Sequence, residues 1–201
     1  TKNKMSLAAI YTPENKVRKE LKAVLENSEI ELLTTAMWAS EPVPFDPMEI
    51  ALHDQYSRIA EKDRRGDFKM YFEYPLEGKP PMMTHIFENS EKDRIIAAKG
   101  APEAILKLCK PGTALQQEIE QVLNNLAGKG YRILGVATSN FSEEEFPEKQ
   151  QELPFEFCGL IAFYDPPKEN IAEVLQQLYT AGIKVKIVTG DNELTTRAIA
   201  G

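Results

Sequence analysis

Residues 68–99, FKMYFEYPLEGKPPMMTHIFENSEKDRIIAAK, alternate three strand-like runs with two runs that are rich in turn-forming residues. The runs 68–74, 82–88 and 94–99 carry β-branched and aromatic side chains, whereas 75–81 and 89–93 hold the Pro, Gly, Asn and Asp that end strands. Connections this short join neighbouring strands in antiparallel order. The stretch therefore predicts a three-stranded antiparallel meander.

Segments on both sides of this meander carry helix signals. Asp46, Pro47 and Glu49 have the spacing of an N-cap, a first helical residue and an N3 residue, which predicts a helix to about residue 62. We expect further helices over 14–26, 29–39 and 102–108 and from 113, and strands over 5–11 and 132–138. Residues 5–156 should therefore form one α+β domain, an antiparallel sheet flanked by helices.

The pattern changes after Pro154. Residues 159–164, GLIAFY, form a continuous apolar run, which is typical of a strand covered on both faces. A helical pattern follows over 168–181, and a second apolar strand is expected at 185–188. This order predicts a parallel βαβ unit with a right-handed crossover. We place a domain boundary near 154–157, with a partial α/β domain over 157–201.

Composition excludes some classes of partner. The chain has 31 acidic and 24 basic residues, and its net charge of −7 disfavours a nucleic acid or an anionic membrane as partner. The two cysteines and two histidines lack metal-ligand spacing, so we predict no thiolate or imidazole metal site. The chain begins with Thr1 and its last helical pattern is still running at residue 200, which suggests a soluble piece of a longer protein.

Two groups of polar residues follow the two strands expected in the second domain. Asp165 follows the first strand and Thr189-Gly190-Asp191 follows the second. Because the carboxyl ends of parallel strands meet at one edge of a sheet, these residues should converge there, beside a helix N-terminus that suits a phosphate group. The alternative is that Asp165 and Asp191 only cap the helices that follow them.

Two basic residues are expected on the sheet of the first domain. Lys99 ends a strand before the turn Gly100-Ala101-Pro102, and Arg132 alternates with apolar neighbours. Side by side on one face, the two cations could neutralise a polyphosphate. Alternatively, Lys99 is a solvated strand end and Arg132 pairs with acidic groups. The chain has neither a G-x-x-x-x-G-K-[ST] loop nor a G-x-G-x-x-G loop for phosphate.

Three further residues are candidates with ordinary structural alternatives. Glu49 has the position of the second half of a capping box. Leu76 and Met83 are by default core or pocket-lining residues.

Several segments resemble, in order, the motifs of P-type cation ATPases of the P2 type, to which calcium pumps belong. Residues 46–52, DPMEIAL, resemble the family's Asp-Pro-x-Glu-x-Ala-Leu, and residues 99–106, KGAPEAIL, resemble its Lys-Gly-Ala-Pro-Glu. Residues 165–167 and 189–191 resemble its Asp-Pro-Pro and Thr-Gly-Asp motifs, and residues 1–5 resemble the end of its phosphorylation motif and the segment directly after it.

The resemblance implies a nucleotide-binding domain inserted into a haloacid-dehalogenase-like phosphorylation domain, of which residues 1–4 and 157–201 would be parts. The parent would be an integral membrane enzyme that couples ATP hydrolysis, through an aspartyl-phosphate, to transport of a cation, with Ca²⁺ favoured by the motifs. This chain would belong to its cytoplasmic part and work with transmembrane and actuator domains of the same protein. The phosphorylated aspartate would precede Thr1, and most Mg²⁺ ligands would also lie elsewhere, so nucleotide binding without turnover is expected.

The resemblance also assigns roles to residues. Glu49 would contact adenine, Lys99 and Gly100 would line the adenine and phosphate pocket, and Arg132 would meet the phosphates. Leu76 stands where the family usually has Phe when Pro75 and Met83 are used to align the strand, so an aliphatic contact would replace aromatic stacking.

The residues after the two expected parallel strands would serve the phosphoryl group. Thr189 and Gly190 would hold it, and Asp191 and Asp165 would support the hinge side of the site.

Two alternatives come from other classes. One is a soluble haloacid-dehalogenase-type phosphatase with a large cap domain, and the other is a non-catalytic interaction module with the same fold.

Overall fold

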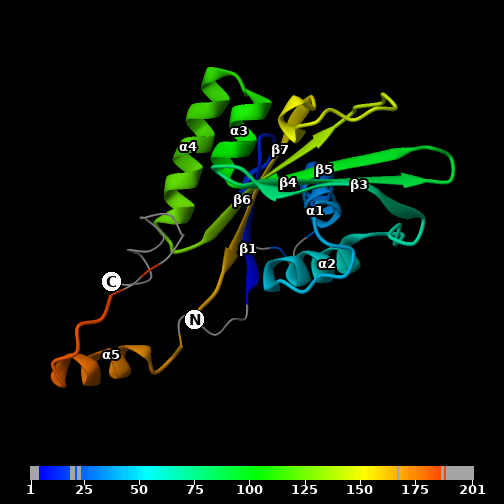
Figure 1. Cartoon of the computed structure of the whole chain (residues 1–201). Helices are drawn as coiled ribbons and strands as arrows, with labels where there is room; N and C mark the ends of the chain where they lie inside the picture. Colours follow the sequence, from blue (N-terminus) through cyan, green and yellow to red (C-terminus); the bar gives the residue numbers. More distant parts are fainter. Residues whose placement is uncertain (1–4, 19–20, 22–23, 167, 187, 189–201) are drawn as a thin grey trace.

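The computed structural model describes residues 5–18, 21, 24–166, 168–186 and 188 (Figure 1). Within this part of the chain the strands form one seven-stranded sheet, in the order β2-β1-β7-β6-β5-β4-β3, and every neighbouring pair is antiparallel. The strands are β1 (Ser6–Thr12), β2 (Lys16–Arg18), β3 (Phe68–Glu77), β4 (Met82–Asn89), β5 (Arg94–Gly100), β6 (Arg132–Ser139) and β7 (Phe155–Tyr164). The helices are α1 (Asn27–Trp38), α2 (Pro47–Ile59), α3 (Pro102–Cys109), α4 (Thr113–Ala127), α5 (Ile171–Thr180) and the short 3₁₀ helix η1 (Gln150–Glu152).

The sheet lies between two layers of helices (Figure 1). On one face, Leu33 of α1 and Leu52 of α2 pack against Val136 and Phe163 of the sheet. On the other face, Ile105 of α3 packs against sheet residues such as Ala98 and Ala137, and α4 contributes Ile119 and Leu126. The expected α+β architecture, an antiparallel sheet flanked by helices, is therefore confirmed.

The meander predicted from residues 68–99 is also confirmed. β3, β4 and β5 pair in sequence, with Met83 opposite Lys99 and Thr84 opposite Ala98. Directly opposed residues share a face of the sheet, so Met83 and Lys99 both point toward the layer of α1 and α2. This register places one end of the meander under the start of α2.

The parallel strand predicted near residue 159 is wrong. β7 runs antiparallel to both of its neighbours, β1 and β6, inside the same sheet as the meander. Its continuous apolar sequence arises because helices cover both faces of this inner strand, and such burial gives the same pattern in either strand orientation. The residues at 157–164 thus belong to the first structural unit.

The rest of the expected βαβ unit is only partly present. α5 forms within the predicted range 168–181, but the described residues of the second predicted strand, 185, 186 and 188, lie outside any strand. Among the described residues no haloacid-dehalogenase-like parallel sheet is found. In the same part of the chain, every helix is too short or too polar to cross a lipid bilayer.

One prediction near the N-terminus is wrong. Residues 16–18 form β2, which pairs with β1 in a hairpin, where a helix over 14–26 was expected. The helix expected over 29–39 is present as α1, which begins through a reciprocal capping box between Glu26 and Glu29. The helix expected from residue 113 is confirmed as α4, with Gly112 at its N-cap position.

Candidate functional site

A buried ion pair joins the end of β5 to the first turn of α2. Lys99 Nζ donates hydrogen bonds to Glu49 Oε1 at 2.6 Å and to Ser40 Oγ at 2.7 Å. The two charged side chains are only 8% and 9% exposed. Lys99 is therefore neither a solvated strand end nor a surface cation, which excludes the alternative drawn from sequence.

The start of α2 fixes the position of Glu49. The Asp46 side chain accepts a 2.8 Å hydrogen bond from the backbone N–H of Met48, and Pro47 occupies the first helical turn, as predicted. Glu49 Oε1 accepts from Lys99 and, at 3.4 Å, from the backbone N–H of Glu41. The Glu49 carboxylate thus faces the sheet and does not close a capping box on the backbone N–H groups at the start of α2.

The electrostatics of the pair leave one atom unsatisfied. Burial lowers the pKa of Lys99 from its ordinary value, and the hydrogen bond and charge of Glu49 oppose that shift. Glu49 Oε2 is buried, and no hydrogen-bond partner for it exists among the described residues. A buried acceptor without a donor is costly, so a ligand that brings an N–H group to Oε2 would be stabilised there.

Met83 and Gly100 flank the lysine with different roles. Met83 lies directly across from Lys99 and is nearly buried, so its thioether lines the same face. A Cβ on Gly100 would come within 2.5 Å of Met82 Cα and 2.6 Å of the Pro81 carbonyl oxygen. Close approach of two strands accounts for the glycine at this position.

Leu76 lies at the outer edge of this region. Tyr74 pairs with Thr84 and Glu77 pairs with Met82, so an irregularity in β3 leaves Pro75 and Leu76 opposite Met83. Leu76 is 63% exposed. It is an accessible apolar side chain next to the nearly buried Met83.

Arg132 is on the same face as Lys99 but not beside it. Lys99 pairs with Val136, and Arg132 lies four residues earlier on β6. Residues two apart share a face, and four residues span about 13 Å of strand. Arg132 is opposite Phe163, two residues before Asp165, so Arg132 and Asp165 are at the same end of the sheet. Three predicted residues, Thr189, Gly190 and Asp191, lie outside the described part of the chain.

Sequence reasoning missed Ser40. Its hydroxyl accepts from Lys99 and donates to the Ala36 carbonyl oxygen, and its own carbonyl oxygen lies 3.1 Å from His85 Nδ1. Ser40 follows the C-terminus of α1 without any motif, and two of its partners, Lys99 and His85, are 59 and 45 positions away. Only the folded chain brings these groups together.

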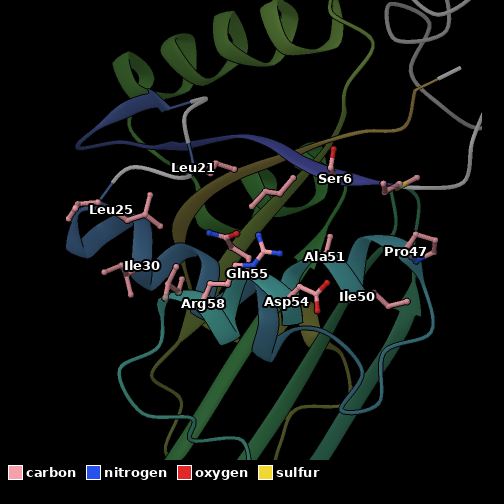
Figure 2. Close-up of a pocket in the computed structure, with 14 residues that line it drawn as sticks. Ser6, Leu21, Leu25, Ile30, Pro47, Ile50, Ala51, Asp54, Gln55 and Arg58 are labelled. Carbon is pink, nitrogen blue, oxygen red and sulfur yellow. The ribbon is translucent and has the colours of Figure 1, made fainter.

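A separate groove of about 900 Å³ lies between β1, α1 and α2 (Figure 2). Its walls are mainly apolar, with polar side chains from Ser6 of β1 and from Asp54, Gln55 and Arg58 of α2. None of the site residues predicted from sequence lines this groove. The groove is therefore separate from the buried ion pair of Glu49 and Lys99.

Comparison with known proteins assigns the family. Residues 45–170 match the family model for the P-type ATPase, cytoplasmic domain N. The chain is 30% identical over 190 residues to the sodium/potassium exporting P-type ATPase cta3 of Schizosaccharomyces pombe, covering 89% of this chain and 18% of that protein. It is 31% identical over 168 residues to the sodium/potassium-transporting ATPase subunit alpha-4 of Homo sapiens, covering 74% and 16%. It is also 31% identical over 145 residues to the calcium-transporting ATPase of Bacillus subtilis, covering 67% and 16%.

The chain spans less than a fifth of the length of each of these three relatives. The family match covers α2, the meander, α3, α4, β6 and β7, which together contain Glu49, Met83, Lys99 and Arg132. This chain belongs to the P-type ATPase family, and the matched part is its cytoplasmic domain N.

Proposed function

We propose that this chain is the ATP-binding cytoplasmic part of a cation-transporting ATPase, with adenine bound beside Glu49, Lys99 and Met83. The observation that carries the proposal is the orphaned Oε2 of Glu49. The exocyclic amine of adenine is an N–H donor that would satisfy it. Lys99 has three N–H donors, of which bonds to Ser40 and Glu49 use two. The third suits a ring nitrogen of the base.

Apolar contacts would hold the faces of the base. Met83 supplies a polarisable thioether at the floor of the site, and thioethers pack well on aromatic rings. The exposed Leu76 at the adjacent bulge is the side chain that a base would cover. With an aliphatic residue at this position, we expect van der Waals contact with the base and no ring stacking.

The phosphates would extend from the base toward Arg132. This residue is on the same face as Lys99, about 13 Å along the strand direction. Its planar guanidinium binds phosphate oxygens in pairs. Asp165 lies at the same end of the sheet, so the reacting phosphate would approach the segment that continues to Thr189, Gly190 and Asp191.

Mg²⁺ would accompany the triphosphate in the parent enzyme. This ion prefers phosphate and carboxylate oxygens and keeps several waters, and most of its protein ligands are expected elsewhere in the parent enzyme. Bound Mg²⁺ would screen the phosphate charge during phosphoryl transfer. The chain's own contribution is to orient the nucleotide.

The remaining parts of the proposal concern the parent protein. ATP hydrolysis through an aspartyl-phosphate, coupling to transmembrane and actuator domains, and a cytoplasmic location on an integral membrane protein are expected from the family resemblance. Calcium is the cation favoured by the motifs, whereas the relatives are named for sodium and potassium as well as calcium.

We place the start of the phosphorylation-domain segment after Tyr164, because β7 belongs to the antiparallel sheet.

Titration with a fluorescent ATP analogue tests the proposal. Lys99→Glu should weaken binding at least about 10-fold, because it removes a donor and adds a negative charge next to Glu49. Arg132→Ala should weaken binding of ATP but leave adenosine affinity unchanged. Lys107→Ala, an exposed change on α3, serves as the control. Equal ATP affinity in wild type and Lys99→Glu, with both folded by circular dichroism, would reject the proposed site.

A further inference from the structure

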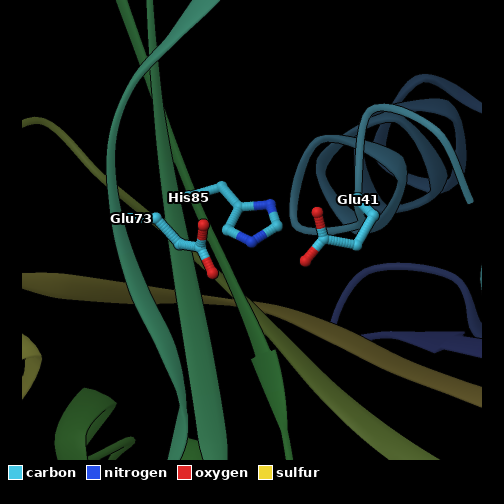
Figure 3. A group of neighbouring side chains, drawn as sticks. All are labelled: Glu41, Glu73 and His85. Carbon is cyan, nitrogen blue, oxygen red and sulfur yellow. The ribbon is translucent and has the colours of Figure 1, made fainter.

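Three side chains from separate elements converge next to the ion pair. Glu41 follows the C-terminus of α1, Glu73 lies on β3 and His85 lies on β4. Each offers one ligand atom, and these atoms all lie within 4.8 Å of one another. Figure 3 shows the imidazole ring of His85 between the two carboxylates.

The hydrogen bonds of His85 leave one ring nitrogen as a potential ligand. His85 is fully buried, and its Nδ1 lies 3.1 Å from the carbonyl oxygen of Ser40. A carbonyl oxygen only accepts, so Nδ1 carries the proton and Nε2 keeps its lone pair. Nε2 is itself buried and has no hydrogen-bond partner among the described residues. An imidazole held by an Nδ1–H to carbonyl bond, with Nε2 open, has the arrangement of a metal-binding histidine.

We propose that His85 Nε2 and one carboxylate oxygen each from Glu41 and Glu73 bind a single borderline divalent cation, with Zn²⁺ the best fit. One nitrogen and two carboxylate ligands suit Zn²⁺ or Co²⁺, whereas Mg²⁺ and Ca²⁺ prefer oxygen alone. Two carboxylates balance the double charge of the ion. Three protein ligands leave a fourth position for water.

The geometry requires a small adjustment. Zinc bonds of about 2.0–2.1 Å in a tetrahedron place ligand atoms about 3.3 Å apart, compared with up to 4.8 Å here. Glu73 is exposed and Glu41 is partly exposed, so both unbranched side chains can close on the ion while the buried ring of His85 stays in place. The nearby cation of Lys99 is already paired with Glu49, whose negative charge offsets part of its repulsion of the ion.

This site is next to the proposed nucleotide site but distinct from it. Ser40 links the two, because its carbonyl oxygen accepts from His85 and its hydroxyl accepts from Lys99. The proposal does not depend on nucleotide binding and is tested without nucleotide.

Calorimetric titration of the 201-residue chain with Zn²⁺ tests the proposal. The background carries Cys109→Ser and Cys158→Ser, so that the two thiols cannot contribute. We expect one ion per chain, and at least about 10-fold weaker binding in each of Glu41→Gln, Glu73→Gln and His85→Gln. Two controls should bind Zn²⁺ as tightly as the cysteine-free background. They are Glu77→Gln, at another exposed glutamate of β3, and His53→Gln, at the other histidine. Mg²⁺ should not compete at equal concentration.

The exposed Glu73 keeps the test decisive if replacement of the buried His85 unfolds the chain. Unchanged Zn²⁺ affinity in folded Glu73→Gln would overturn the proposal. The absence of one-to-one Zn²⁺ binding in the cysteine-free background would also overturn the proposal. A loss of Zn²⁺ affinity in His53→Gln as large as that in Glu73→Gln would do the same. Visible absorption of the Co²⁺ form should show a tetrahedral site in the cysteine-free background, and this absorption should be lost in Glu73→Gln.

Discussion

Lys99 Nζ lies 2.6 Å from Glu49 Oε1, and both side chains are more than nine-tenths buried. Removing two charges from water is unfavourable unless good geometry and additional hydrogen bonds offset it. The hydroxyl of Ser40 supplies one such bond to Lys99. Among the described residues no donor reaches the second oxygen of the carboxylate, and on our account a nucleotide base fills that position.

Breaking this pair should destabilise the fold strongly. Lys99→Met leaves the Glu49 carboxylate buried without its cation, and we expect a loss of about 3–5 kcal/mol in the free energy of unfolding. The double variant Lys99→Met with Glu49→Leu should recover most of this loss, since no unpaired charge remains. Urea unfolding measures the free energy of unfolding of the single and the double variant. Lys62→Met breaks the exposed pair with Asp67 and should change stability by less than about 1 kcal/mol. A similar small effect for Lys99→Met would contradict the account.

His53 should make the fold sensitive to mild acid. Burial, and then the charge of Arg65, lower the pKa of His53 below its ordinary value of 6.5. Below that ordinary value the unfolded chain binds a proton that the folded chain does not, so stability falls as the pH drops from 6.5 toward the folded pKa. His53→Gln should therefore lose less stability than wild type between about pH 7.5 and about pH 5.5.

Urea midpoints at several pH values, measured with a chelator present, check the effect of His53. Lys62→Gln, a change at an exposed position, should follow the wild-type pH dependence. Parallel curves for wild type and His53→Gln would count against a neutral His53 in the fold.

Gly100 should be intolerant of a side chain for reasons of packing. A Cβ would meet the Met82 backbone at 2.5 Å, and backbone atoms cannot move aside cheaply. We expect Gly100→Ala to lower stability by about 1–3 kcal/mol or more. Gly66→Ala is the matched control, because nothing lies within 4 Å of its Cβ position. Thermal unfolding compares the two, and equal midpoints would refute this role for Gly100.

Asp46 should stabilise the helix that carries Glu49. Its side chain caps the Met48 N–H, and Asp46→Ala should reduce stability by about 1 kcal/mol. Asp46→Asn keeps an acceptor oxygen and should lose only a fraction of that amount. If the two variants were equally unstable in urea, a role other than capping would have to explain Asp46.

The local fold could be predicted wherever short-range patterns decide it. Turn residues between 68 and 99 indicated the meander, and Asp46 with Pro47 indicated the start of α2. The orientation of β7 could not be predicted, because burial on both faces erases the alternation that distinguishes an antiparallel strand. β2 was missed since three residues that pair only with β1 carry too little pattern of their own.

The candidate site was partly predictable. Lys99, Glu49, Met83 and Arg132 could be named from motifs, but their spatial relationships depend on sheet register and on contacts between residues about 50 positions apart. Ser40, Glu41 and His85 have no sequence spacing that would link them. The hydrogen bonds of Ser40, the position of Glu41 beside His85 and the unpartnered Nε2 of His85 become apparent only once the chain is folded.

The most direct test of the central claim is the location of ATP on this chain, mapped by amide chemical-shift changes in a two-dimensional NMR titration. We predict the largest changes at Glu49, Met83, Lys99 and Ala101, smaller ones at Arg132, and none along the groove near Ile30, Ala51 and Ile59. Changes concentrated on that groove, with the amides around Lys99 unaffected at saturating ATP, would contradict the account.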